Sequence, residues 1–93
     1  MNEIEFKRNI ERVLVHADND DVRVICGWTL LIPKKRAVEY ANGFGNNTNP
    51  NEGFSSMDSM DGEKICLTHN GGKITFSRNE AQDIVNFIKL KYT

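Results

Sequence analysis

The first seventeen residues carry apolar side chains three or four positions apart, with charged side chains between them. Asn2 is a suitable helix N-cap, and the acidic run DNDD at 18–21 ends the pattern. This spacing predicts an amphipathic helix over residues 3–17. Its apolar face would consist of Phe6, Ile10, Val13, Leu14 and Ala17.

A strand-like pattern follows in residues 22–32, VRVICGWTLLI, which are rich in β-branched and aromatic side chains. Val22, Val24 and Cys26 fall on one face because side chains alternate along a strand. Gly27 fits a bend, a bulge or a tight link between two strands. We expect two strands in this segment.

Residues 33–41, PKKRAVEYA, fit two structures. A proline at the first helical position, the spacing of Ala37 and Tyr40, and a following Asn-Gly pair favour a short helix. The alternation of Val38 and Tyr40 with their neighbours suits a strand instead. We favour the strand because residues 28–32 need a partner nearby.

The last thirty residues carry the clearest local pattern. Two apolar–polar alternating runs flank Asn70-Gly71, and Asn-Gly is a strong signal for a tight hairpin. Ser77 and Glu80 have the spacing of a capping box, which starts a helix. The buried face of that helix would consist of Ala81, Ile84, Val85, Ile88 and Tyr92.

These segments predict one α+β domain over residues 1–93. The expected order is α-β-β-β-loop-β-β-α, with residues 33–41 as the third strand. We expect a small antiparallel sheet of about four to five strands, with the N- and C-terminal helices packed on one face. The long loop would span residues 42–62.

Composition limits the function classes. The chain has 39% hydrophobic and 27% charged residues, ordinary for a soluble domain, and no apolar run approaches the roughly 20 residues that cross a bilayer. The start of the chain lacks the apolar core of a signal peptide, so a cytoplasmic location is expected. The net charge of −1 argues against a nucleic-acid-binding surface, which needs a basic excess.

Segment 42–62 is the centre of a stretch without bases: residues 37–63 contain five acids and no lysine or arginine. Its large apolar side chains either fix the segment to the core or form an adaptable surface patch. Phe54, Met57 and Met60 are spaced by three, so a helical turn would present them together. The residues predicted to bind a partner are Phe44, Phe54, Met57, Asp58, Met60 and Asp61.

Lys34, Lys35 and Arg36 form the densest basic cluster. They are typical of a solvated turn, and the alternative is a site for an anion such as a nucleotide phosphate. Trp28 is expected to pack in the core or on a sheet face, and the alternative is a binding hot spot.

The four residues with soft ligand atoms do not form a recognisable site. Cys66 and His69 are three apart on an expected strand, where side chains point to opposite faces, which argues against zinc. Cys26 and Cys66 lie in apolar runs and are expected to be buried thiols, while His16 is expected at the surface, as is His69. We expect no metal and no cofactor.

The resulting hypothesis is a non-enzymatic protein-binding module that acts as a stoichiometric inhibitor, adaptor or regulator. Its acidic and apolar loop would dock on a partner with a basic or apolar patch, and self-association through a free sheet surface is a further expectation. Small standalone proteins of this kind are frequent in phages and mobile elements. The alternatives are a binder of a small anionic ligand such as a nucleotide and, third, an enzyme that uses Cys66 or His69.

Overall fold

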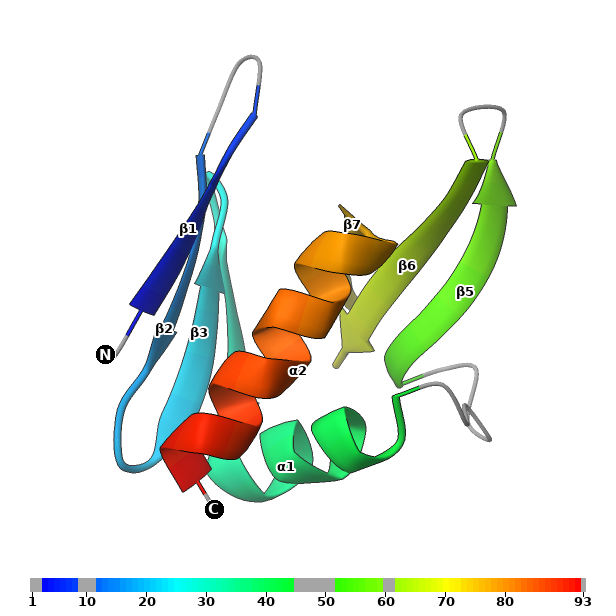
Figure 1. The fold of residues 1–93 in the computed structure, drawn as a ribbon. Coiled ribbons are helices and arrows are strands. Elements are labelled where there is room, and N and C mark those ends of the chain that lie inside the picture. Colours follow the sequence, from blue (N-terminus) through cyan, green and yellow to red (C-terminus); the bar gives the residue numbers. More distant parts are fainter. Residues whose placement is uncertain (1–2, 9–11, 45–51, 60–61, 93) are drawn as a thin grey trace.

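The structure is a computed structural model that describes residues 3–8, 12–44, 52–59 and 62–92 (Figure 1). Four strands precede a helix, and three more strands precede a second helix, so the α+β class is confirmed. The elements are β1 (Glu3–Lys7), β2 (Arg12–Ala17), β3 (Asp21–Ile25), β4 (Thr29–Pro33), α1 (Lys34–Asn42), β5 (Gly53–Ser59), β6 (Gly62–His69), β7 (Gly72–Ser77) and α2 (Arg78–Tyr92).

The strands form two sheets rather than the single predicted sheet. An N-terminal sheet has the order β1-β2-β3-β4, and a C-terminal sheet has the order β5-β6-β7. All five pairings are antiparallel and join strands adjacent in sequence. Among the residues that the structure describes, each sheet is therefore a meander whose two outer strands pair on one side only.

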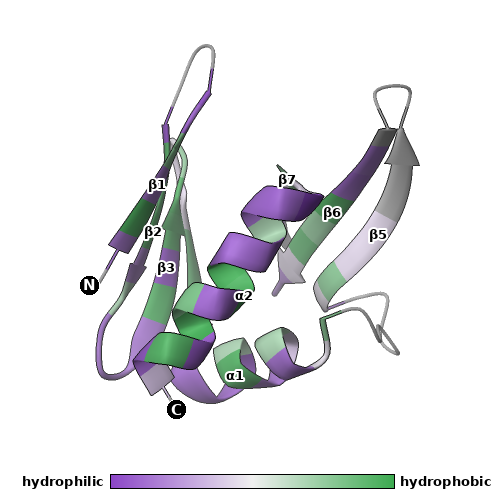
Figure 2. Ribbon diagram, in the orientation of Figure 1, coloured by the Kyte–Doolittle hydropathy of each residue, from purple (hydrophilic) through white to green (hydrophobic). Residues whose placement is uncertain are grey.

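Helix α2 lies between the two sheets and crosses α1, which closes the lower end of the molecule in Figure 1. It contacts β6 and β7 on one side and β1 and β2 on the other. In Figure 2 hydrophobic positions alternate with hydrophilic ones along the strands and α2. The core includes Val15, Val24, Phe76 and Ile84, all fully buried.

The predicted N-terminal helix is wrong, because residues 3–17 contain the two strands β1 and β2. Val13 and Val15 are buried on one face of β2, and they pair with Phe6 and Ile4 of β1. The alternation of a strand places Ile4 and Val15 on the same face as Phe6 and Val13, whereas the predicted helical face did not include Ile4 or Val15. Their β-branched side chains favour a pleated surface.

The preference for a strand over residues 33–41 is also wrong, because residues 34–42 form α1. Strand β4 has its partner in β3, where Leu30 pairs with Val24. Residues 28–32 therefore did not require a further neighbour. Pro33 is the N-cap, and Ala37 and Ala41 are buried one turn apart.

The C-terminal prediction is confirmed. Asn70 and Gly71 have φ values of 49° and 83°, as a tight hairpin turn requires. The Ser77 amide donates to Glu80 Oε1 at 2.9 Å, and the Glu80 amide donates to Ser77 Oγ at 3.1 Å. This reciprocal capping box starts α2. The buried face of α2 includes Phe87, which was not predicted, and Tyr92, which was predicted to be buried, is only partly buried.

Segment 42–62 is not a loop throughout. Residues 53–59 form β5, which pairs with β6 through Phe54–Leu67 and Ser56–Ile65. The helical turn predicted from the spacing of Phe54, Met57 and Met60 is therefore wrong over 53–59. Among the described residues, neither helix is long and apolar enough to cross a membrane.

Candidate functional site

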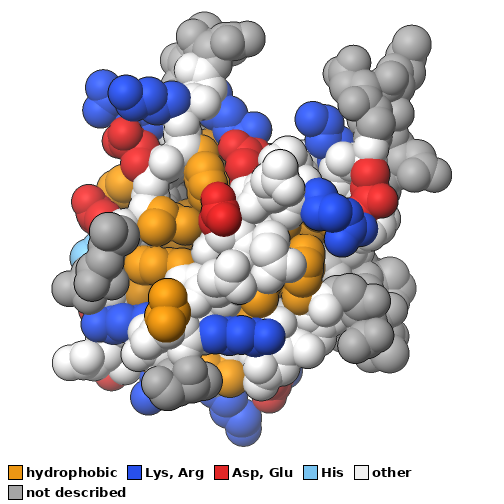
Figure 3. Space-filling model, in the orientation of Figure 1, with side chains coloured by type: hydrophobic (Ala, Val, Ile, Leu, Met, Phe, Trp, Pro, Cys, Tyr) orange, Lys and Arg blue, Asp and Glu red, His pale blue; other side chains and the backbone are white. Residues whose placement is uncertain are grey.

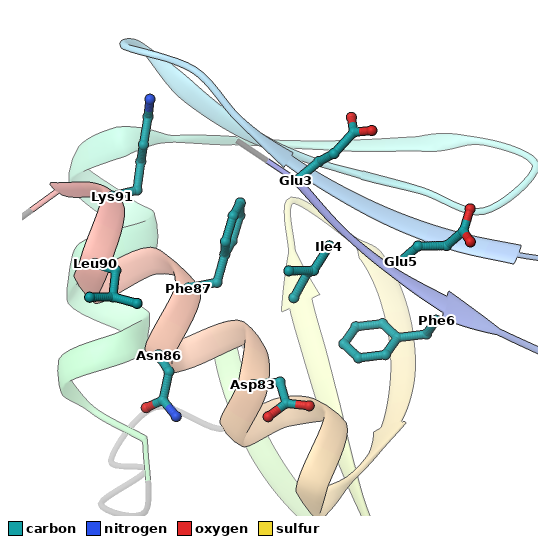
Figure 4. Close-up of a pocket in the computed structure, with 9 residues that line it drawn as sticks. All are labelled: Glu3, Ile4, Glu5, Phe6, Asp83, Asn86, Phe87, Leu90 and Lys91. Atoms are coloured by element: carbon teal, nitrogen blue, oxygen red, sulfur yellow. The ribbon is translucent and has the colours of Figure 1, made fainter. Parts of the chain in front are cut away.

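An open groove of about 880 Å³ runs between β1 and α2, and we call it the acidic groove (Figure 4). One side of the groove is the edge strand β1, and the other side is a face of α2. The two elements are distant in sequence. The groove is lined by Glu3, Ile4, Glu5, Phe6, Asp83, Asn86, Phe87, Leu90 and Lys91.

The wall of the acidic groove is apolar. Ile4 and Phe6 point from β1 toward α2, and Phe87 points back from the helix (Figure 4). Leu90 leaves 84% of its surface exposed, the largest value among the large hydrophobic residues that the structure describes as exposed. Figure 3 shows a strip of hydrophobic side chains along this face. An exposed leucine alone is ordinary, but a leucine that continues an apolar groove marks a surface suited to a partner.

The rim of the acidic groove carries three carboxylates and one amine. Glu3 Oε2 lies 3.2 Å from His16 Nδ1, and a Glu5 oxygen lies 3.6 Å from Arg12. Both contacts are solvent-exposed, so they constrain the carboxylates only weakly. The rim therefore favours a cationic group from a ligand.

Strand β1 is an edge strand. Within the described chain it pairs only with β2, so its other side presents backbone N–H and C=O groups to solvent. Such an edge is a template for another strand. Glu3, Glu5 and Lys7 are exposed on the outer face of β1, and charged side chains of this kind discourage pairing with indiscriminate partners.

Of the predicted partner-binding residues, the structure describes the side chains of Phe44 and Phe54, and neither lines this groove. Phe54 is buried, and its ring meets the half-buried Phe44 ring edge to face at 5.5 Å. These two rings pack in or against the core, which is one of the two alternatives raised by the sequence. The side chains of Met57 and Asp58, and residues Met60 and Asp61, lie outside the described part of the structure. Their role in binding stays a prediction.

The basic cluster lies in the first turn of α1. The Lys34 ammonium sits 5.4 Å from the centre of the Tyr92 ring, and an Arg36 nitrogen lies 2.9 Å from a Glu39 oxygen. Lys35 is exposed. Two of the three cations therefore have internal contacts, and anion binding by this cluster stays a prediction.

A polar cluster that the sequence did not reveal joins Tyr40, Glu52 and His69. The Tyr40 hydroxyl donates to Glu52 Oε2, and the Tyr40 oxygen lies 2.8 Å from His69 Nδ1. Because the Tyr40 hydroxyl donates its hydrogen to Glu52, the Tyr40 oxygen accepts a hydrogen bond from Nδ1–H of His69. The expectation of a surface His69 is wrong, since only 5% of the residue is exposed.

The same contacts shift two proton equilibria. Burial, followed by the bond to Glu52 and its charge, raises the pKa of Tyr40. The hydrogen bond from Tyr40 is the main cause that lowers the pKa of Glu52. The cluster ties α1 to the start of β5 and the end of β6. Residues 12 and 29 positions apart give no local pattern by which the sequence could reveal it.

The remaining candidates give no metal site. Among the residues that the structure describes, no three His, Cys, Asp or Glu side chains are grouped to hold a metal ion. Cys26 and Cys66 are not in a disulfide; Cys66 is buried, whereas Cys26 is only partly buried. Trp28 is 46% exposed, so it is not a core residue, and the expectation of core packing is wrong.

Comparison of the chain with protein-family models, with curated proteins and with solved structures finds no match. The fold and the acidic groove define a small α+β domain with an open apolar surface beside a free sheet edge.

Proposed function

We propose that the protein is a non-enzymatic binding module that takes up an extended, basic and apolar segment of another protein in the acidic groove. Such a module would act as a stoichiometric inhibitor, adaptor or regulator. The observation that carries this proposal is the position of Leu90, 84% exposed, in an apolar groove next to β1, whose outer edge has no partner strand among the described residues. A bound strand gains affinity from main-chain hydrogen bonds to the edge of β1 and from contacts of its side chains with the apolar surface.

The mode that this geometry favours is addition of a partner strand to β1. A strand hydrogen-bonded to β1 would extend the N-terminal sheet along the groove, next to Phe87 and Leu90. Its main chain would use the free backbone groups of β1, and alternate side chains would determine specificity.

The alternation of β1 specifies the partner's pattern. Ile4 and Phe6 lie on the inner face, so the neighbouring partner side chains on that face should be apolar. Glu3 and Glu5 lie on the outer face, where cross-strand neighbours should be lysine or arginine. The expected ligand therefore alternates apolar and basic residues.

The test is titration of a labelled eight-residue peptide of alternating valine and lysine, followed by fluorescence anisotropy. Leu90→Asn should weaken binding by about tenfold or more, about 1.4 kcal/mol, because it places a polar group without a hydrogen-bond partner against the peptide's apolar face and adds no charge. Leu31→Asn is the matched control, since Leu31 is 49% exposed on β4 and does not line the groove. Equal affinity of both variants and the wild type would reject the groove as the site.

Two further peptides separate strand addition from simple charge attraction. A peptide with all valines before all lysines has the same charge but lacks alternation, and it should bind more weakly. A peptide N-methylated at alternate residues, on the edge that would pair with β1, loses its donors and should not bind. Unchanged binding of the methylated peptide would reject strand addition while leaving the groove in place.

The predicted role of segment 42–62 needs a narrower test than removal of the whole segment. Glu52 bonds to Tyr40 and β5 begins at Gly53, so a change beyond residue 51 would damage the fold. Replacement of residues 46–50 by a glycine–serine linker leaves both contacts intact. Loss of partner binding in that variant, with peptide binding in the acidic groove unchanged, would assign the loop a binding role of its own.

A further inference from the structure

A second groove, of about 540 Å³, lies where the N-terminal sheet approaches the edge of β7, and we call it the basic groove. It is separate from the acidic groove and shares none of its lining residues. Its volume falls within the range of small-molecule sites. The basic groove is lined by Arg8, Val13, Cys26, Trp28, Lys73, Ile74 and Thr75.

Trp28 supplies an accessible aromatic surface in this groove. It ends the three-residue connection between β3 and β4, where Gly27 has a φ of 95° and the Cys26 amide donates to the Trp28 carbonyl at 2.9 Å. A Cβ on Gly72 would lie 3.3 Å from Cζ3 of the indole. The edge of the ring that carries Cζ3 therefore lies close to Gly72 of β7, while 46% of the residue stays exposed.

Arg8 supplies an oriented cation. Its Nη2 atom lies 3.1 Å from Glu80 and donates to the Thr75 carbonyl at 3.3 Å, and the guanidinium lies 5.7 Å from the centre of the Phe76 ring. Both polar contacts use Nη2, and a guanidinium has five N–H donors. The donors on Nε and Nη1 are not used by these two contacts.

Lys73 supplies a second cation, exposed on β7. The seven described residues that line the groove include these two bases and neither Asp nor Glu. Val13 and Ile74 contribute buried apolar surface beneath them. The groove thus combines an aromatic face, an apolar floor and two donors suited to a phosphate.

We propose that the basic groove binds a nucleoside monophosphate, with the base stacked on Trp28 and the phosphate held by Arg8 and Lys73. A single nucleotide suits it better than a nucleic-acid strand. The chain has a net charge of −1, and a strand would need a basic path beyond these two residues. The proposal is independent of peptide binding in the acidic groove.

The test uses the fact that Trp28 is the only tryptophan in the chain. Titration with adenosine 5′-monophosphate should quench the intrinsic fluorescence in a saturable way, because a stacked base contacts the indole directly. Adenosine and inorganic phosphate, each carrying half of the ligand, should bind about tenfold or more weakly. Absence of saturable quenching at millimolar nucleotide would overturn the proposal.

Lys73→Gln should weaken nucleotide binding by about tenfold, since it removes one of two phosphate contacts from an exposed position where the fold tolerates change. Lys35→Gln is the matched control, an exposed lysine in the first turn of α1 that should have no effect. Loss in Lys35→Gln with normal binding in Lys73→Gln would instead place the ligand at the α1 cluster and overturn the assignment. Tighter binding of an adenine dodecamer than of the mononucleotide would show a nucleic-acid strand as the ligand and also overturn it.

Discussion

The acidic and basic grooves differ in charge and in volume, about 880 and 540 Å³, although the same stretch of chain contributes to both. Phe6 lines the acidic groove, and Arg8, two residues later, lines the basic groove. Both side chains contact the buried ring of Phe76, with a ring-centroid distance of 6.1 Å for Phe6 and a guanidinium–centroid distance of 5.7 Å for Arg8. The two grooves are therefore separate surfaces, and one residue from each groove packs against the same buried ring of Phe76.

The comparison shows that a nearly neutral chain can carry two surfaces of opposite preference. The acidic groove has three carboxylates around an apolar strip and an open strand edge, which suits an extended cationic segment. The basic groove has two cations beside an exposed indole, which suits a planar anion. A net charge of −1 averages these surfaces and conceals both.

The largest expected effect comes from Phe76→Ala, which removes the contact that the two grooves share. Phe76 is fully buried, so the truncation should lower the free energy of unfolding by about 3–5 kcal/mol in urea denaturation. Both ligands should bind more weakly because both walls lose support. Leu90→Ala is the control; Leu90 is mostly exposed, so it should cost about 0.5 kcal/mol or less.

If Phe76→Ala does not fold, Phe76→Leu tests the same contact with a smaller loss of about 1.5 kcal/mol or less. A loss confined to one ligand would show that the ring supports only one groove. In that case Phe76 would not be a support that the two grooves share.

The sequence correctly predicted the C-terminal hairpin and helix α2, where the local sequence preferences agree with the tertiary structure. The hairpin at Asn70-Gly71 and the capping box at Ser77 and Glu80 are short-range patterns with local physical causes. The N-terminal prediction failed because Val13, Leu14 and Val15 form a continuous apolar run, which contains both a helical spacing and the alternation of a strand. Pairing of Ile4 with Val15 decides between them, and this is a tertiary contact.

Gly72→Ala should affect one groove only. A Cβ at this position would lie 2.7 Å from Cδ1 of Leu30 and 3.3 Å from the Trp28 ring, so both side chains must move. The crowding should cost about 1–3 kcal/mol of stability and weaken nucleotide binding, while peptide binding in the acidic groove stays unchanged. Fluorescence titration and thermal denaturation measure the two effects.

Gly43→Ala is the matched control for that substitution. Gly43 has a φ of −87°, and its added Cβ would meet the Glu39 carbonyl at an ordinary 3.4 Å. The change should be neutral or stabilising by about 0.4–1 kcal/mol. A similar loss in both variants would indicate that Gly72 acts through backbone freedom rather than through the Trp28 contact.

Tyr40→Phe should leave both grooves unchanged, since Tyr40 lines neither. The substitution removes the hydroxyl that joins Glu52 to His69, and it should cost about 1–2 kcal/mol, measured by urea denaturation at neutral pH. Loss of ligand binding in this variant would show that the cluster supports a groove at a distance.

The pH dependence of stability is a second way to measure the contact between Tyr40 and Glu52. The pKa of Glu52 is lowered in the folded state, so its contribution is present above its ordinary value of 4.5 and is lost as the pH falls through the folded pKa. The pKa of Tyr40 is raised, so its contribution is present below 10.0 and is lost as the pH rises through the folded pKa. Tyr40→Phe should flatten both limbs of the stability curve between acid and alkaline pH.

The candidate sites were less accessible to sequence reasoning than the fold. Leu90 follows the buried stripe of α2 and looks like an ordinary helix residue until the edge of β1 is placed beside it. Arg8, Trp28 and Lys73 come from three separated segments, and the closest pair is 20 positions apart. The predicted residues Phe44 and Phe54 were singled out for their size, but size favours burial as much as binding.

The smallest expected effect is the response of the two grooves to salt. Raising the ionic strength from about 0.1 M to about 1 M shortens the screening length from about 10 Å to about 3 Å. Nucleotide affinity, which depends on Arg8 and Lys73, should fall severalfold. Peptide affinity should fall less, because salt does not screen the apolar contacts of Phe87 and Leu90 and excluded salts strengthen them. Parallel titrations in sodium chloride measure how steeply each affinity falls with salt concentration.

A steeper fall for the peptide would mean that Glu3, Glu5 and Asp83, rather than the apolar strip, supply most of its affinity. The acidic groove would then be an electrostatic surface of the same kind as the basic groove.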